Sequence, residues 1–282
     1  MQPAMFKRNV GQIYLSLVPI LTTIFAFVTG HISYKIYLPI WIINVCLMII
    51  AAWILGAHVI RNHDHEKKHL AVIGCFLITP GLLVSIFFGM GAPPETPAEW
   101  VATATEQQVR FSILIICATL IGFGLGLLRE KLKTTGENFY SQLGFTAIMM
   151  AIPLFVIVTT FWHSFALESY RIQMASASEK IPEWYLPIRK QVWVISMVEV
   201  VLIYLATAAF AASLKSAGWF RKTPSRIYIV ISLFAIIIIL LYPIYPVSVT
   251  SAGFPYIPFM IPGVTFFMLY FIGINLLRRA GN

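Results

Sequence analysis

The sequence predicts an all-α integral membrane protein that crosses the bilayer eight times, as two tandem four-helix repeats. Its composition is the first reason: 59% of the residues are hydrophobic and 11% are charged, whereas soluble domains carry about 25% charged residues. The second reason is a set of long apolar runs. The third is a series of motifs that recurs in the same order in both halves of the chain.

A spanning helix needs ~20 residues, because each residue adds ~1.5 Å and the hydrocarbon core is ~30 Å thick. Eight runs of about this length occur, at residues 12–31, 38–60, 69–91, 111–128, 143–166, 191–214, 227–247 and 256–277. Almost every residue lies in or beside a run, so no stretch is left for a soluble domain. Only two basic residues precede the first run, and no small-residue cleavage motif follows it. This pattern indicates a retained helix and not a signal peptide.

The basic residues predict the orientation of these helices, because Lys and Arg are retained on the cytoplasmic side. An inside N-terminus places 14 of the 20 Lys and Arg residues on that side: Lys7, Arg8, Arg61, Lys67, Lys68, Arg129, Lys131, Lys133, Lys215, Arg221, Lys222, Arg226, Arg278 and Arg279. Both termini are then cytoplasmic, and we expect a bacterial inner (plasma) membrane protein. The net charge of +9 follows from this topology and favours anionic lipid, so it does not indicate a nucleic-acid partner.

Four motif pairs recur in the two halves of the chain. They are "SYKI" (33–36) and "SYRI" (169–172), "YLPI" (37–40) and "YLPI" (185–188), Pro-x-x-Pro at 94–97 and at 243–246, and "GLGLLR" (124–129) and "GINLLR" (273–278). Because the pairs keep their order, the sequence predicts a duplication in which residues 1–140 and 141–282 each form a four-helix domain. The alternative is that membrane interfaces favour Pro and aromatic residues in any case.

Each half has an even number of spans, so both halves enter the membrane from the same side and a pseudo-twofold axis along the membrane normal relates them. This symmetry pairs His31 with His163 near the outer face. Such a pair could ligate one haem or metal ion between the halves, because imidazole is a good ligand for Zn, Cu and Fe. Alternatively, each histidine caps its own helix end.

The halves differ most at Glu199, an acid near the centre of the run 191–214, where the first half has Ala51. A charged side chain at the bilayer centre costs ~3 kcal/mol on insertion scales, so it normally faces a cavity or a partner. The sequence therefore predicts either a proton- or cation-binding group or a protonated acid that hydrogen-bonds a neighbouring helix. Polar residues at compatible depth are Asn44, Thr159, Ser196 and Tyr204. Of these, Asn44 and Ser196 are the predicted site partners.

A second candidate metal site is the segment 58–69, which holds four His, one Asp and one Glu. His63 and His65 within it have a spacing that suits a transition metal, but a solvated turn between two helices can have the same composition. The three cysteines lie within apolar runs and outside any CxxC motif, which indicates core residues.

Ala118, Gly122 and Gly126 recur every four residues in the run 111–128. This small-residue stripe lets another backbone approach closely, so it predicts a tight contact either within the bundle or with a second copy or partner subunit. In the preceding outer loop, the segment 96–99 has the capping-box pattern with Pro at the first helical position. It predicts a short helix with Trp100 near the membrane interface.

The signatures GxSG and GxGD and the Walker and Rossmann glycine patterns do not occur in the sequence. The sequence leaves open whether the protein is an enzyme. We expect a small proton- or cation-linked transporter or channel with its site between the repeats near Glu199. Two alternatives stand beside it: a non-catalytic membrane subunit of a larger complex, and a haem or metal redox protein that uses His31 and His163. The sequence does not indicate the substrate.

Overall fold

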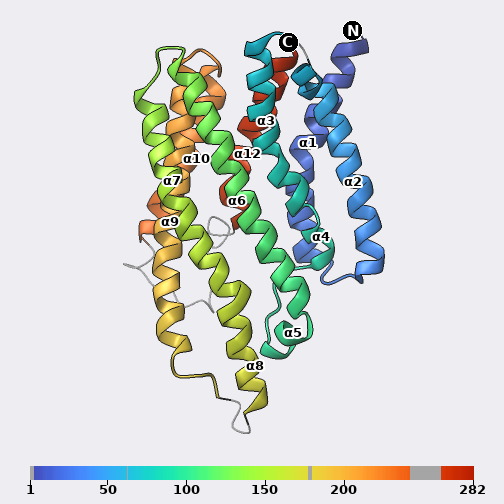
Figure 1. Ribbon diagram of the computed structural model, residues 1–282, viewed down its shortest axis with the longest axis vertical. Helices are drawn as coiled ribbons and strands as arrows, with labels where there is room; N and C mark the ends of the chain where they lie inside the picture. Colours follow the sequence, from blue (N-terminus) through green and yellow to red (C-terminus); the bar gives the residue numbers. More distant parts are fainter. Residues whose placement is uncertain (1–2, 62, 177–179, 242–261) are drawn as a thin grey trace.

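Helices form all the regular structure of residues 3–61, 63–176, 180–241 and 262–282, which are the residues that the computed structural model describes (Figure 1). The elements are α1 (Pro3–Val28), α2 (Tyr34–Leu55), the 3-10 turn η1 (Ala57–Arg61), α3 (His65–Val84), α4 (Phe87–Met90), α5 (Pro97–Ala102), α6 (Ala104–Lys133), α7 (Phe139–Thr160), the π-helical turn η2 (Phe161–Ala166), α8 (Leu167–Ala175), α9 (Tyr185–Ser216), α10 (Lys222–Leu241) and α12 (Pro262–Gly281).

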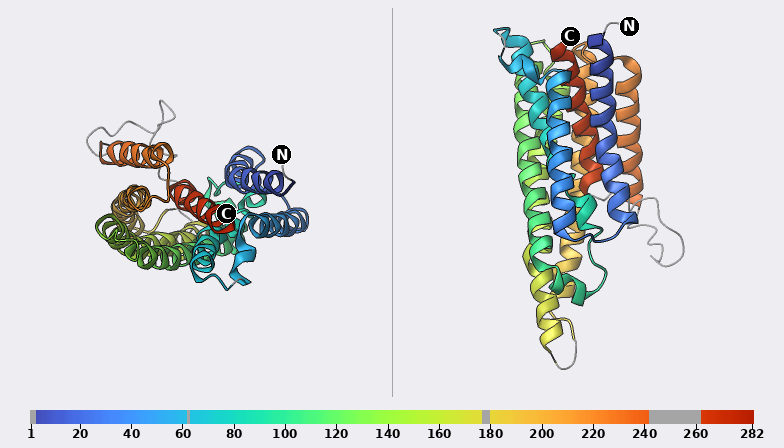
Figure 2. Two further views of the ribbon diagram at one scale, coloured as in Figure 1. Left: turned by 90° about the horizontal axis from the view of Figure 1, so that it is seen from above. Right: turned by 90° about the vertical axis from the view of Figure 1, so that its right-hand side faces the viewer.

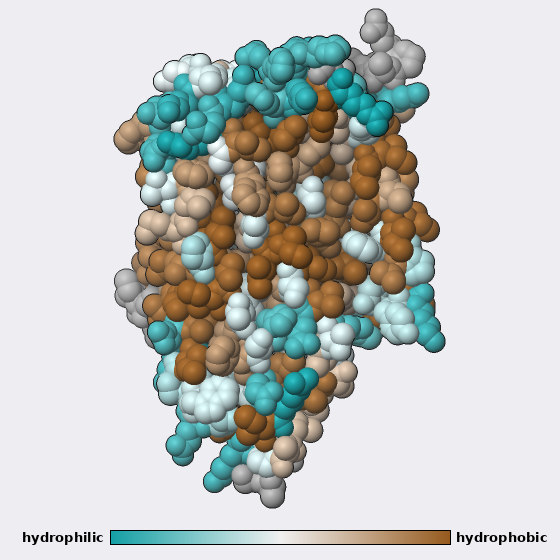
Figure 3. Space-filling model, viewed as in Figure 1, coloured by the Kyte–Doolittle hydropathy of each residue, from teal (hydrophilic) through white to brown (hydrophobic). Residues whose placement is uncertain are grey.

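Seven helical segments within the described ranges are long and apolar enough to cross a membrane: Phe6–Val28, Tyr34–Leu55, His65–Met90, Ala104–Lys133, Phe139–Ala175, Tyr185–Ser216 and Lys222–Leu241. Many large apolar side chains on these segments are exposed. Figure 3 shows them as a hydrophobic belt between two more hydrophilic ends. Length and composition therefore indicate a multi-pass membrane protein that contacts a lipid bilayer.

The eighth predicted span, 256–277, begins at residues that the structure does not describe. Its described part belongs to α12, which lies in the middle of the bundle when the molecule is seen from above (Figure 2). α12 is not one of the seven candidate spans, and Arg278 and Arg279 occupy its last turn. Seven of the eight expected spans thus have a matching helix that meets the length and hydropathy requirement.

Glycines allow α12 to pack closely against α3. A Cβ atom on Gly81 would lie 2.2 Å from the Tyr270 ring, and one on Gly74 would lie 2.7 Å from the Leu277 side chain. Gly273 on α12 likewise faces the backbone of Gly74. Small residues at a helix crossing bring backbones together and strengthen van der Waals packing where lipid offers no hydrophobic driving force. This crossing ties the last helix of the chain to the first half.

The predicted duplication is only partly visible in how the helices pack. α1 packs against α2, and the helices matched to them, α7 and α9, also pack together. However, α3 packs against α6, whereas its match α10 packs mainly against α9. The Pro-x-x-Pro motif at 243–246 lies outside the described residues. The four-plus-four repeat thus stays a prediction from the sequence.

The small-residue stripe of α6 lies inside the bundle. Ala118 is fully buried. A Cβ atom on Gly122 would lie 2.5 Å from Ile152, and one on Gly126 would lie 3.4 Å from Phe145. Both neighbours belong to α7, so the stripe serves the contact between α6 and α7. A contact of this stripe with a partner subunit or a second copy stays a prediction from the sequence.

The short helix expected from the segment 96–99 is confirmed as α5. The Thr96 hydroxyl accepts a hydrogen bond from the Glu99 backbone N–H at 3.3 Å, and Pro97 takes the first helical position. Trp100 is buried, and its indole donates to the Pro94 carbonyl oxygen at 2.8 Å. Its ring stacks against Phe111 and against Trp162, so α5 is held against α6 and η2.

A carboxylate near the termini holds the start of α7. Glu137 accepts hydrogen bonds from the backbone N–H groups of Tyr140 (2.8 Å) and Ser141 (3.1 Å), and from the Ser213 hydroxyl of α9. Burial raises the pKa of Glu137, but these hydrogen bonds to the charged form outweigh burial and leave the pKa below its ordinary value of 4.5. Glu137 therefore caps α7 and joins it to α9.

The segment α7–η2–α8 and helix α9 are longer than a bilayer requires. They contain 37 and 32 residues, which correspond to about 55 Å and 48 Å at ~1.5 Å per residue. The hydrocarbon core is ~30 Å thick. The end of the first segment, α8, extends beyond the other helices at the end opposite the termini (Figure 1).

Candidate functional site

Glu199 lies within α9 and is 3% exposed. In a helix, residues spaced by about 3.6 positions share a face, so Glu199 lies on the same face as Val192, Ile203, Ala206 and Phe210. All four of these neighbours are buried. Glu199 is thus part of the packed stripe of α9 and not of its lipid-exposed side.

This stripe of α9 faces α7. Toward the end with the termini, the Phe210 ring and the Ala206 carbonyl oxygen lie against Gly144 of α7. Toward the other end, Val192 packs in a cluster with Val158 of α7. Glu199 falls between these two levels, so its carboxyl group enters the apolar contact between α7 and α9.

No hydrogen bond or ion pair connects the Glu199 carboxyl group with another described residue. The nearest basic residues along α9 are Lys190, nine positions before it, and Lys215, sixteen positions after it. At ~1.5 Å per residue these are about 14 Å and 24 Å away along the axis. Glu199 is therefore an acid among apolar neighbours, closer to the start of α9 than to its end.

The other polar residues expected near Glu199 have separate surroundings. Ser196 precedes Glu199 by three positions on α9 and is half-buried, so it is a neighbour on the same helix. The Thr159 hydroxyl donates to the Phe155 carbonyl oxygen at 2.6 Å within α7. Tyr204 packs in a cluster between α9 and α10.

The structure does not bring Asn44 to Glu199. Asn44 accepts a hydrogen bond from the Tyr14 hydroxyl at 2.7 Å and donates to the Ser85 hydroxyl at 3.2 Å. Ser85 in turn donates to the Leu82 carbonyl oxygen at 2.7 Å. These bonds connect α1, α2 and the end of α3, so Asn44 belongs to a satisfied network in the first half of the chain.

His31 and His163 have different partners. The Nε2 atom of His31 lies 2.7 Å from a carboxylate oxygen of Glu106 on α6. The Nδ1 atom of His163 lies 2.7 Å from the hydroxyl of its neighbour Ser164. The two imidazoles therefore share no described ligand or partner, and the geometry gives no support to haem or metal ligation by this pair.

The histidine-rich segment forms the start of α3. His63 and His65 are both exposed. The Asp64 carboxylate between them caps the helix by accepting from the N–H groups of Glu66 and Lys67. Within the described ranges, no group of three or more His, Cys, Asp or Glu side chains is arranged to hold a metal ion.

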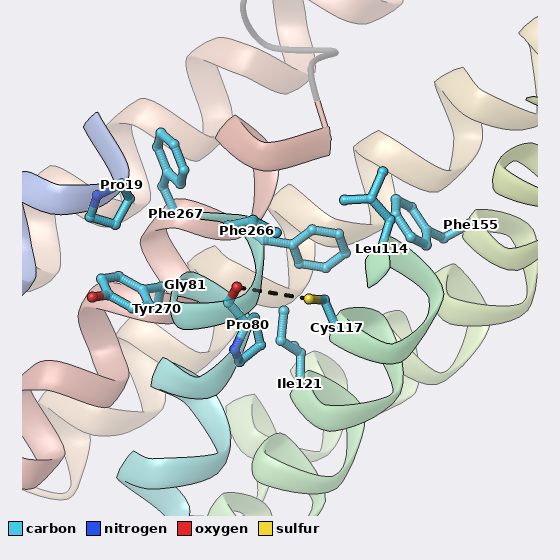
Figure 4. A pocket seen from close by; sticks show the side chains of 11 residues that line it. Pro19, Pro80, Gly81, Leu114, Cys117, Ile121, Phe155, Phe266, Phe267 and Tyr270 are labelled. Carbon is cyan, nitrogen blue, oxygen red and sulfur yellow. Dashed lines mark hydrogen bonds between the residues drawn. The ribbon is translucent and has the colours of Figure 1, made fainter. Parts of the chain in front are cut away.

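A small cavity lies where α3, α6, α7 and α12 meet, and its volume is about 30 Å³ (Figure 4). Its lining is apolar, and its main polar contact is the Cys117 thiol, which donates to the Pro80 carbonyl oxygen at 3.8 Å. A water molecule in such a space needs two to four polar partners. Phe155 of α7 borders this cavity, but Glu199 does not.

Sequence reasoning missed a buried cation near the start of α6. Arg110 is 4% exposed, and its guanidinium donates to the carbonyl oxygens of Met90 (3.1 Å) and Gly91 (2.8 Å). Gln107, one turn earlier, is also buried. The sequence does contain a signal for this buried cation, because the basic residue Arg110 directly precedes the apolar run 111–128. These residues fold the connection after α4 onto α6.

Comparison with known proteins found no matching family model, no similar characterised protein and no similar solved structure.

Proposed function

We propose that this protein is a small proton- or cation-linked membrane transporter in which Glu199 binds and releases the ion. The observation that carries the proposal is the position of Glu199, which is buried on the α7-facing side of α9 and has no described partner. Ionisable residues within membrane segments are costly to insert, and they typically mark ion or substrate pathways. A carboxylic acid is a chemical group that can exchange a proton or coordinate a cation.

The apolar surroundings of Glu199 favour a role in coupling. An isolated carboxylate is expensive to keep in a low-dielectric site, so loss of its proton requires that water or a cation reaches it. Access requires the contact between α7 and α9 to open. Ion binding at Glu199 and movement of these two helices are then linked, as alternating access requires.

The proposal includes the topology expected from the charges. The two termini lie at the same end of the molecule (Figure 1), as an even number of spans requires. We propose that this end is cytoplasmic, that α12 completes an eighth span, and that the protein resides in a bacterial inner membrane. The shorter path to Glu199, from Lys190, then begins at the outer side.

Proton flux into liposomes tests this function. The full-length protein is reconstituted with a trapped pH-sensitive dye, and a pH gradient is imposed with K⁺ and valinomycin to fix the membrane potential. We expect flux above that of protein-free vesicles, and Glu199→Gln should reduce it to the protein-free level. Glu130→Gln, which changes an exposed acid on α6, is the matched control and should retain the flux.

Two results would overturn the proposal. One is wild-type protein that moves neither protons nor Na⁺ or K⁺ faster than empty vesicles, although it elutes as a folded species. The other is full ion flux in the Glu199→Gln protein. Thermal unfolding of both proteins shows whether a loss of flux comes from a loss of folding.

A second candidate function, a subunit of a larger membrane complex, has its own supporting observation. The outer extension formed by η2, α8 and the start of α9 carries exposed apolar side chains, including Phe165 (51%), Met174 (53%) and Leu186 (53%). Apolar surface beyond the bilayer is typical of protein contacts. Sedimentation of gently solubilised native membranes tests this function: a subunit should sediment as a larger species, and Leu186→Glu should release it.

A further inference from the structure

A groove of about 430 Å³ runs between α1 and α2 near the end that carries the termini. Its lining includes Lys7, Val10 and Gly11 from α1 and Leu47, Ile50 and Ala51 from α2. Except for the Lys7 ammonium and the Tyr14 hydroxyl, its lining side chains are apolar. The groove is unrelated to the surroundings of Glu199, which lies on α9.

The groove opens toward the bilayer. α1 and α2 are both candidate spans, and the side chains at its rim are exposed: Val10 by 49%, Leu47 by 48% and Ile50 by 54%. At its floor, Gly11 lies so close to α2 that an added Cβ atom would be 3.2 Å from the Ala51 carbonyl oxygen. A hollow bounded by apolar side chains and open to lipid suits a hydrocarbon chain.

Positive charge gathers at the terminal end of the groove. Lys7 lines the groove, and its ammonium has no hydrogen bond or ion pair with a described residue. Arg8 donates to the Arg278 carbonyl oxygen at 3.0 Å, and Arg278 donates to the Gln12 amide oxygen at 2.6 Å. Both acceptors are neutral, and none of these three cations is paired with a carboxylate of a described residue.

We propose that this groove binds one anionic phospholipid, with an acyl chain between α1 and α2 and the headgroup phosphate at Lys7. The apolar lining accounts for the chain, and the unpaired Lys7, together with the neighbouring Arg8 and Arg278, accounts for the preference for negative charge. Lys and Arg beside a membrane surface attract anionic lipids. A phosphate oxygen is the acceptor that the Lys7 ammonium lacks.

Native mass spectrometry of the full-length protein in detergent tests the site. Phosphatidylglycerol and phosphatidylcholine with identical acyl chains are the two probes. We expect wild-type protein to retain phosphatidylglycerol at least several-fold more strongly than phosphatidylcholine. Lys7→Gln should remove this preference and Lys7→Arg should keep it. Lys35→Gln, an exposed lysine at the other end of α2, is the control and should leave the preference intact.

The two parts of the site can be separated. Val10→Trp fills the groove from its exposed rim, so it should weaken retention of both lipids, and glycerol 3-phosphate should compete poorly because it lacks acyl chains. Equal retention of the two lipids by wild-type protein, or an unchanged preference in Lys7→Gln, would show an ordinary lipid annulus and overturn the proposal. So would strong competition by glycerol 3-phosphate, which would indicate a phosphate site without a chain groove.

Discussion

Asn44 and Glu199 are both polar side chains within apolar helices, but the structure surrounds them in opposite ways. Asn44 uses its amide oxygen and its amide N–H groups in hydrogen bonds to Tyr14 and Ser85, which connect three helices. Glu199 lies in the apolar contact between α7 and α9. A satisfied buried polar group stabilises one arrangement of helices, whereas an unsatisfied one costs stability and suggests selection for another property.

The largest expected effect comes from breaking the Asn44 network. Asn44→Leu leaves the Tyr14 hydroxyl without its acceptor, so the free energy of unfolding should fall by about 1–3 kcal/mol. Unfolding of the detergent-solubilised protein by SDS titration measures it. A double-mutant cycle with Tyr14→Phe should give a coupling energy of about 0.6 kcal/mol, and no more than ~1.7 kcal/mol. Additive effects would contradict the network.

Glu137 offers a carboxyl group of the opposite kind to Glu199, because it is fully hydrogen-bonded. Glu137→Gln removes the cap of α7 and should lower the free energy of unfolding by roughly 0.5–2 kcal/mol at pH 7. Because folding lowers the pKa of Glu137, its contribution is present above the unfolded value of 4.5. It is lost as the pH falls through the lower folded value.

Stability curves between pH 7 and pH 3 measure this contribution. The gap between wild-type protein and Glu137→Gln should close as the pH falls below about 4.5. Ser213→Ala should show a smaller gap of the same sign, since Ser213 donates to the same carboxylate. A gap that widens toward low pH would contradict the cap.

Replacing Glu199 should change the free energy of unfolding in the opposite direction to replacing Asn44. Glu199→Leu removes an acid from the contact between α7 and α9, so the free energy of unfolding should stay unchanged or rise by about 1 kcal/mol. The same SDS titration measures it, with Asn44→Leu beside it. A decrease of more than about 1 kcal/mol in the free energy of unfolding would show that Glu199 has a stabilising partner. Glu199 would then be a satisfied polar group like Asn44.

The smallest effect concerns His31. The His31 side chain is 47% exposed in its pair with Glu106, and exposed pairs contribute about 0.2–1 kcal/mol. His31→Gln should therefore shift the midpoint of thermal unfolding by only a degree or two, similar to His163→Gln. Spectra of the oxidised and dithionite-reduced protein should lack a Soret band, whereas a band that either substitution removes would restore the redox hypothesis.

The sequence predicted those features that depend on local pattern. Apolar runs indicated seven spans that have matching helices, and the segment 96–99 indicated α5. The runs understated helix length, because α9 continues through Arg189 and Lys190 beyond the hydrocarbon core. Charged residues end an apolar run without ending a helix, so α8 and the first turns of α9 left no hydropathy signal.

The candidate site was predictable in part for the same reason. An acid within an apolar run is visible in one sequence, and Glu199 is indeed buried. Its neighbours are not visible, because they depend on which helices pack together. Asn44 was grouped with Glu199 by depth alone, but α2 packs against α1 and α3. The small-residue stripe at Ala118 similarly indicated a close contact without indicating that α7 would fill it.

The central position of α12 has a consequence for biogenesis. The glycine face of α3 receives α12, which is synthesised after every other described helix and after roughly 180 intervening residues. Domains form from the N-terminus onward during synthesis. Until α12 is inserted, lipid or a chaperone must therefore cover the glycine face of α3. The middle of this bundle is therefore filled only after the described helices around it have been synthesised. A chain that stops before Pro262 loses its centre, and quality-control proteases would meet an open ring of helices.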